Sequence, residues 1–248
     1  MALAVQRALA LLRLFKQSRP EIGLSEAARL TGESKATVYR LFGTLCESGL
    51  VEQVEGTKTY RLGPAVLDLA RVREATVPLL SVVQPVLDDL LELTGETCHF
   101  TQFNGQAMAV VATAESRKVH RITMQGITTL PLDTTAAGVA FLAFASPAVS
   151  GSVLQEAARD AKEKAELEAR LELTRARGYS EYEFLGDDEA FGVAAPVFRG
   201  GSFAFGSLAV VVPPHRMQPP LFQKILQGIL AGSKTISMKI GSQLRVEH

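Results

Sequence analysis

The stretch LSEAARLTGESKATVYRLFGTL, residues 24–45, decides the fold of this sequence. Its first part predicts a short helix over 25–30, which ends at Thr31-Gly32 because glycine is common just past a helix C-terminus. Ser34 then offers a side-chain oxygen as the N-cap of a second helix over about 35–48. The apolar residues of that helix recur at the spacing of one buried face: Val38, Leu41, Phe42 and Leu45. The stretch therefore predicts two helices joined by a tight turn.

Segments on both sides extend this pair of helices into a larger unit. Before it, apolar residues from Val5 to Phe15 recur at helical spacing and predict a first helix that ends near 18–20. After it, two β-prone runs, 50–54 and 59–62, flank a turn with a glycine and predict a hairpin. Three helices and a hairpin make a winged helix-turn-helix over residues 1–64. Residues 65–78 are expected to form a connector helix to a second domain over 79–248.

The polar face of the predicted helix 35–48 carries the chemistry of the first domain. In a helix-turn-helix protein, the second helix enters the major groove and reads base edges, while Lys and Arg contact phosphates. A lysine at the hairpin tip would add a contact to the backbone or the minor groove. The residues expected to contact duplex DNA are Ser25, Lys35, Ala36, Thr37, Tyr39, Arg40, Thr44 and Lys58. The alternative is a helical subdomain with a solvated charged face.

The charge balance does not decide between these two interpretations. The formal net charge is zero, and residues 1–64 hold nine Lys and Arg against six Asp and Glu. Residues 65–248 hold seventeen against twenty. So small an asymmetry can arise by chance, although a positive first domain would suit a nucleic acid.

The remainder of the chain alternates between helical and strand periodicity. Helices are expected over 79–93, over about 134–145, within 152–177 and from 218 to about 239. Strands are expected over 97–103, 108–114, 120–123, around Tyr182, and over 193–198 and 203–212. Because most strands are linked as hairpins and helices flank them, the expected fold class is α+β, with an antiparallel sheet in the second domain.

Two sets of segments have the order and spacing of one known family. In the first half they are residues 24–32, 35–45, 49–51 and 60–63; in the second half they are LPLDTTAAG at 130–138, RGY at 177–179 and VAAPV at 193–197. These segments resemble the IclR family of bacterial transcriptional regulators. The resemblance implies a regulator, such as a repressor, whose DNA binding responds to a small-molecule effector. It also implies a GAF/PAS-like sensor domain and assembly into homodimers or homotetramers.

The helix predicted to start near Thr134 is the expected effector site. Its small residues Ala136 to Gly138 leave the N–H groups of the first turn open to a ligand. A helix N-terminus has a positive dipole end that suits a carboxylate, so a small organic acid is the expected effector, as the resemblance also implies. The residues expected to contact it are Thr134, Thr135, Ala137, Gly138, Val139, Asp188, Gly192, Val193 and Ser207.

Other features leave the class of ligand open. Val139 stands where a lysine often follows the glycine in the family, and together with Phe141, Phe191 and Phe205 it favours a more apolar or aromatic acid. The loop that contains Asp188 is either a ligand contact or merely solvated. A third interpretation is that the helix start is capped by its own hydroxyl groups and packed in the core.

An enzyme that converts a small metabolite is the alternative from another functional class. The sequence holds no GxSxG, HExxH or GxGxxG motif. Cys98 and His99 are neighbours in a predicted strand, so they point to opposite faces and make a poor pair of metal ligands. We therefore expect no catalytic residue, no metal site and no cofactor.

Composition and cysteine content indicate a cytoplasmic protein. The 248 residues are 47% hydrophobic and 21% charged, which is typical of a soluble globular protein. Two cysteines about fifty positions apart form no disulfide framework. The longest apolar run, 136–145, is shorter than the roughly 20 residues that a bilayer span needs, so no membrane partner is expected.

Overall fold

The computed structural model of the chain describes residues 2–16, 19–76, 78–127, 129–157, 160–184 and 189–243. The chain forms two compact units, Met1–Pro78 and Leu79–His248. Within the described ranges, no helix combines the length and the apolar character that crossing a membrane requires.

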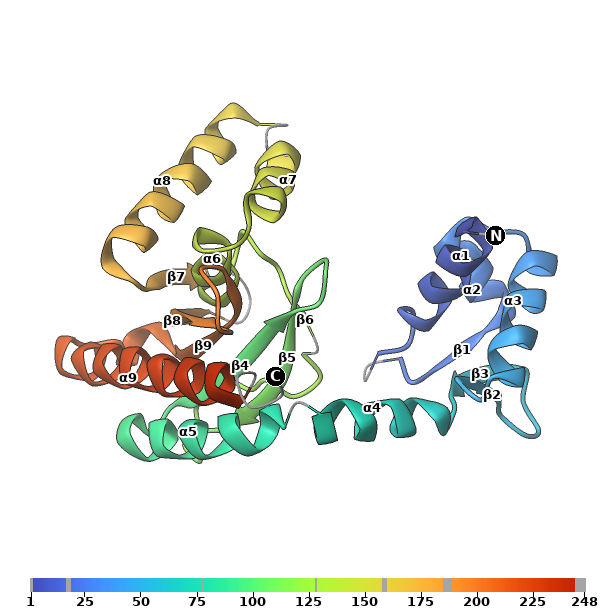
Figure 1. Ribbon diagram of the computed structural model, residues 1–248, viewed down its shortest axis with the longest axis horizontal. Coiled ribbons are helices and arrows are strands. Elements are labelled where there is room, and N and C mark those ends of the chain that lie inside the picture. Colours follow the sequence, from blue (N-terminus) through green and yellow to red (C-terminus); the bar gives the residue numbers. More distant parts are fainter. Residues whose placement is uncertain are drawn as a thin grey trace. The chain divides into compact units, whose positions relative to one another are not determined.

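The first unit is a winged helix-turn-helix, as the sequence predicts (Figure 1). Its elements are α1 (Ala2–Leu12), β1 (Glu21–Gly23), α2 (Leu24–Thr31), α3 (Lys35–Glu47), β2 (Val51–Gln53), β3 (Thr59–Leu62) and α4 (Ala65–Thr76). Gly32 ends α2 in the left-handed conformation, with φ of 70°. The Ser34 hydroxyl caps α3 by accepting a hydrogen bond from the Thr37 amide at 3.1 Å. These two residues set the tight turn between the helices.

A small apolar core holds α3 against the wing formed by β2 and β3. Phe42 of α3 is fully buried, and its ring stacks on Tyr60 of β3 with the ring centroids 4.3 Å apart. The buried members of the core are Leu11, Ile22, Ala27, Ala28, Val38, Phe42, Leu45, Val51 and Tyr60. Because every element from α1 to β3 contributes to this core, the orientation of α3 depends on the whole unit.

Two details of the first unit differ from the prediction. Helix α1 ends at Leu12, where the amides of Leu14 and Phe15 bond to the carbonyls three residues before them and begin a turn. Strand β1 adds an edge to the wing by pairing antiparallel with β3, with Ile22 opposite Tyr60. A strand of three residues is too short to show an alternating pattern, so the sequence did not indicate it.

The second unit is built on one antiparallel sheet with the strand order β6-β5-β4-β9-β8-β7. Its strands are β4 (Thr97–Phe103), β5 (Met108–Ala114), β6 (Thr129–Leu130), β7 (Ser180–Phe184), β8 (Ala190–Phe198) and β9 (Ala204–Val212). The predicted strand 120–123 is wrong, because these residues run as a loop. There the Ile122 carbonyl accepts a bond from the Thr97 hydroxyl at 2.6 Å, and the Met124 amide donates to the Glu115 carboxylate at 3.1 Å.

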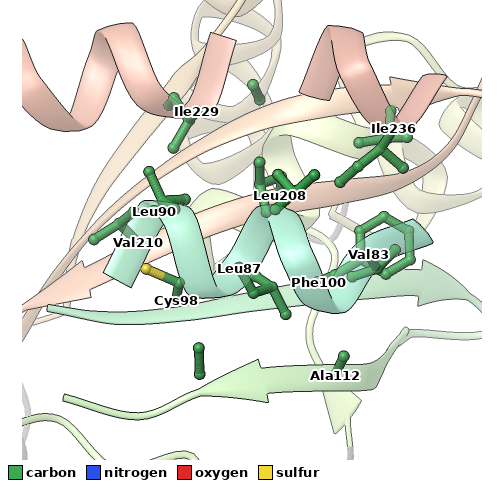
Figure 2. Packing of buried hydrophobic residues seen from close by; sticks show 14 of the residues in the cluster. Val83, Leu87, Leu90, Cys98, Phe100, Ala112, Leu208, Val210, Ile229 and Ile236 are labelled. Carbon is green, nitrogen blue, oxygen red and sulfur yellow. The ribbon is translucent and has the colours of Figure 1, made fainter. Parts of the chain in front are cut away.

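Helices α5 (Leu79–Thr94) and α9 (Pro219–Gln243) cover one face of this sheet. Figure 2 shows Leu87 and Leu90 of α5 packed over Cys98 of β4 and Val210 of β9. Each such fully buried aliphatic side chain contributes about 1.5–3 kcal/mol relative to its exposed state. This face is therefore the main apolar core of the second unit.

The other face carries α6 (Ala136–Ala143), with α7 (Pro147–Ala157) and α8 (Ala161–Arg177) beyond it. Small residues let α6 lie close to the sheet, where the hydroxyls of Ser180 and Ser207 donate to the carbonyls of Ala136 and Ala137 at 2.6 and 2.9 Å. The helix starts at Ala136, two residues later than the sequence indicates. A 3-10 turn, Pro214–Arg216, joins β9 to α9.

Candidate functional site

The exposed face of α3 presents a row of polar and basic side chains. Its members Lys35, Ala36, Tyr39, Arg40 and Thr44 are exposed, whereas Thr37 is half-buried. The opposite face is the buried stripe of the core, so burial of that stripe turns the polar face outward. The Thr37 hydroxyl lies 3.0 Å from the Ser34 hydroxyl, so it reinforces the cap at the start of the helix.

Basic side chains of the first unit divide into paired and unpaired sets. Arg7 pairs with Glu33 at 2.8 Å, and Arg61 pairs with Glu52 at 2.6 Å. Among the described residues, these basic side chains have no acidic partner: Arg29, Lys35, Arg40 and Lys58. Ser25 is exposed one turn before Arg29 on α2, and Lys58 is exposed in the turn between β2 and β3. Unpaired, solvated cations can contact DNA phosphates without first breaking an ion pair.

The second unit contains a cavity of about 400 Å³ between the sheet and the start of α6. The sheet contributes His99, Tyr182, Phe184, Ala190, Gly192, Ala209 and Val211 to its walls. The start of α6 contributes Thr134, Thr135, Ala136 and Ala137. The segment before it contributes Leu130 of β6, Pro131 and the loop residues Arg121, Ile122, Thr123, Met124 and Ile127. The walls are thus mainly apolar, with a few polar groups, which is typical of a site for a small molecule.

The start of α6 offers two free backbone donors to this cavity. The Thr135 hydroxyl accepts a bond from the Gly138 amide at 3.0 Å and donates to the Pro131 carbonyl at 2.8 Å. One N–H group of the first turn is therefore capped by the helix's own side chain. The amides of Ala136 and Ala137 have no acceptor within the described part of the chain. Two donors at a positive helix end remain for a ligand.

Two side chains set the electrostatics of the cavity. Burial lowers the pKa of His99 to about 4, so its imidazole is neutral at pH 7. Arg121 is partly exposed and brings a positive charge; its Nη1 donates to the Lys118 carbonyl at 3.4 Å, and its Nε lies 3.9 Å from a Glu115 oxygen. An anion in the cavity would therefore meet one cation and two backbone donors.

Comparisons with known proteins agree with the division of the chain into two units. Residues 4–55 match the IclR helix-turn-helix domain, and residues 75–238 match the bacterial transcriptional regulator IclR C-terminal domain. The chain belongs to the IclR family of bacterial transcriptional regulators. IclR-family proteins are DNA-binding regulators and not enzymes, so the enzyme alternative is set aside.

Individual relatives within the IclR family match nearly the full length of the chain. The glycerol operon regulatory protein of Streptomyces griseus is 29% identical over 222 residues, 87% of either chain. The acetate operon repressor of Salmonella typhimurium is 26% identical over 250 residues, 96% of this chain and 90% of the repressor. A crystal structure of a regulator assigned to the family, from Silicibacter sp. TM1040, is 38% identical, with a TM-score of 0.88 over 96% of each chain.

The nine residues expected to contact an effector in this IclR-family protein have different positions in the structure. Four of them line the cavity: Thr134, Thr135, Ala137 and Gly192. Asp188 lies outside the described residues. The other four do not line the cavity, and each has a packing role. Gly138 abuts the backbone of Pro131 and Leu132, and Val139 packs with Leu142 and Leu167. Val193 belongs to the core under α5 and α9, and the Ser207 hydroxyl links Thr101 to α6.

Aromatic residues expected to line the cavity also lie elsewhere. Phe141 stacks on Phe103 with the ring centroids 4.8 Å apart, and the ring centroid of Phe205 lies 5.9 Å from that of Phe100. Phe191 packs against the main core. The aromatic residues that do line the cavity are Tyr182 and Phe184 of β7.

Sequence reasoning missed His99, Arg121 and the loop that encloses the cavity. One signal was available for His99, since it alternates with Cys98 and Phe100, which face the core. Cys98 points away from His99, and burial raises the pKa of its thiol to about 12. The described residues hold no group of three or more His, Cys, Asp or Glu side chains that could bind a metal ion.

Proposed function

We propose that this IclR-family regulator binds its operator through α3 and that a small organic acid in the cavity of the second unit alters that binding. The observation that carries the proposal is the pair of free amides, of Ala136 and Ala137, at a positive helix end that opens into a mainly apolar cavity. Such a site suits a carboxylate attached to an apolar body. Arg121 adds the positive charge that Val139 does not supply.

On the DNA side, we place Lys35, Tyr39, Arg40 and Thr44 of α3 at the major groove. Lys58 on the wing would contact the adjacent backbone or minor groove. Ser25 and Arg29, one turn apart on α2, would contact phosphates beside the groove. This assignment rests on the exposure of these residues and on the absence of acidic partners for the cations in the described part of the chain.

Fluorescence anisotropy on the upstream region of the protein's own gene tests the DNA assignment. Replacing Arg40 by Ala should weaken binding by about 1–3 kcal/mol if it contacts a base, or reduce the salt dependence by about one counterion if it contacts a phosphate. Lys224→Ala is the matched control, because this exposed lysine of α9 lies in the other unit. If both variants bind DNA like the wild type, α3 is not the helix that contacts DNA in the major groove.

Isothermal titration with a panel of aliphatic and aromatic carboxylates tests the effector assignment. Each acid is compared with its primary amide, which has a similar shape but no charge. We expect the acids to bind more tightly, and Arg121→Gln to reduce this preference. Arg117→Gln is the control, since Arg117 is exposed in the same loop but does not line the cavity. Equal affinity for acids and amides would contradict a carboxylate site.

We further propose that the protein acts as a homodimer or homotetramer and that α4 contributes to its dimer contact. Leu67, Leu69 and Val72 of α4 are each 61–63% exposed in the single chain. Apolar side chains clustered on one helix favour a protein contact. Sedimentation of a Leu69→Lys, Val72→Lys variant should show a shift to smaller species; an unchanged distribution would remove α4 from the contact.

A further inference from the structure

His99 is an exception among the polar side chains that β4 presents to the α6 side of the sheet. Thr97 donates its hydroxyl to the Ile122 carbonyl at 2.6 Å, and Thr101 shares a hydrogen bond with Ser207 at 2.8 Å. His99 lies between them and is 1% exposed, yet neither Nδ1 nor Nε2 has a hydrogen-bond partner in the described part of the chain. A buried polar group without a partner destabilises a fold, so native proteins hold few of them.

The position of His99 makes its imidazole available to a ligand. Its neighbours Cys98 and Phe100 belong to the core under α5 and α9, so the pleat of β4 turns His99 to the opposite face, where it lines the cavity. The neighbouring residues of the sheet that line the cavity are small: Ala209 lies directly opposite His99 on β9, and Gly192 lies on β8. Small neighbours leave room for a ligand to reach the ring.

We infer that His99 is a specificity-determining residue that hydrogen-bonds an uncharged hydroxyl group of the effector. The inference rests on the proposed function for the place of the effector and its carboxylate, and adds that the effector is a hydroxy acid. A neutral imidazole offers one donor and one acceptor, and a hydroxyl group can both accept and donate. Burial keeps this ring neutral at pH 7, so it suits an uncharged partner, whereas the carboxylate is held at α6 and Arg121.

Matched pairs of acids test this inference by titration calorimetry. The probes are benzoate with its three hydroxy isomers, and hexanoate with 6-hydroxyhexanoate. Wild-type protein should bind the best hydroxylated member of a pair about tenfold more tightly than the plain acid. His99→Leu should bind the hydroxylated and the plain acid of each pair with equal affinity, and His99→Gln should retain part of the preference. A preference that persists in His99→Leu, or wild-type binding of acids without any preference, would overturn the inference.

Phenol and toluene separate this inference from the carboxylate proposal. If no acid binds but phenol binds more tightly than toluene to wild type and equally to His99→Leu, the role of His99 holds and the carboxylate assignment fails. If neither the acids nor phenol show a preference that depends on His99, the inference fails. Thermal unfolding checks the variant itself: His99→Leu removes an unpaired buried polar group, so its Tm should rise. A large fall in Tm would instead identify His99 as a packing residue.

Discussion

Arg216 forms a two-point ion pair with Glu96, from Nε to Oε1 at 3.0 Å and from Nη2 to Oε2 at 2.6 Å. The Glu96 carboxylate is 1% exposed and also accepts from Lys118 Nζ at 2.6 Å. Arg216 bonds in addition to the carbonyl of His120. One buried carboxylate therefore joins the start of β4, the 3-10 turn after β9 and the loop that encloses the cavity of the second unit.

Replacing Arg216 by Ala should lower the free energy of unfolding by about 3 kcal/mol, because it leaves most of a buried charge uncompensated. Lys118→Ala should cost only about 1 kcal/mol, since Lys118 is nearly half exposed and water can replace it. Urea denaturation of the two variants measures both values. Equal costs would mean that the two cations share the carboxylate evenly.

His99 should give the protein a measurable loss of stability in mild acid. Its pKa is about 4 in the folded chain and 6.5 in the unfolded chain, so the unfolded state takes up a proton first as the pH falls. Its contribution is complete above pH 6.5 and is lost as the pH falls from 6.5 to 4, which amounts to about 2 kcal/mol at pH 5 relative to pH 7. Among the residues that the structure describes, Arg121 and Tyr182 are the other ionisable side chains that line the same cavity.

Urea midpoints at pH 7 and pH 5, compared between wild type and His99→Leu, isolate this contribution from that of the carboxyl groups. The variant should lose about 2 kcal/mol less than the wild type over this interval. Parallel losses in the two proteins would show that His99 is already paired or hydrated in the folded state.

Replacing Gly138 by Ala should destabilise the fold, whereas replacing Gly192 by Ala should leave the protein folded. A Cβ at residue 138 would lie 2.2 Å from the Pro131 carbonyl oxygen, so Gly138→Ala must displace backbone and should cost about 3 kcal/mol. A Cβ at residue 192 would lie 3.1 Å from the Ala136 methyl, its nearest neighbour, and no backbone atom would lie closer than 3.8 Å, so Gly192→Ala should fold and narrow the cavity. Thermal melts and acid titrations of both variants check this. Unchanged acid affinity in a folded Gly192→Ala protein would exclude this cavity as the acid site.

A second pair of glycines tests the winged helix-turn-helix. A Cβ at residue 63 would lie 2.2 Å from the Gly49 carbonyl oxygen, so Gly63→Ala should disrupt the junction between the wing and α4 and abolish operator binding. Gly43 is exposed within α3 and has open space around it, so Gly43→Ala should stabilise the helix by about 1 kcal/mol. Thermal unfolding monitored by circular dichroism distinguishes the two. A stable Gly63→Ala protein that still binds DNA would contradict the close contact.

The first unit could be predicted from sequence because its signals are local. Gly32 and Ser34 fix the turn between α2 and α3, and both act on residues within four positions of themselves. The cavity could be predicted only in part, because its walls come from five strands, a helix start and a loop. The absence of a side chain at Gly138 indicated space for a ligand, but it serves a close backbone contact with Pro131 instead. Residues 120–123 were predicted to form a strand, because the local pattern does not reveal the bonds that hold them as a loop. Those bonds come from the distant side chains of Thr97 and Arg216.

The alternation of Cys98, His99 and Phe100 along β4 also bears on how regulators of this kind diverge. Residues 98 and 100 maintain the core under α5 and α9, whereas residue 99 faces only the cavity side. Under the proposed role of His99, a single nucleotide change in codon 99 would alter which metabolite a descendant senses while the packing of its sheet is inherited unchanged. New sensory specificities can accumulate on one side of the sheet under selection that preserves the other.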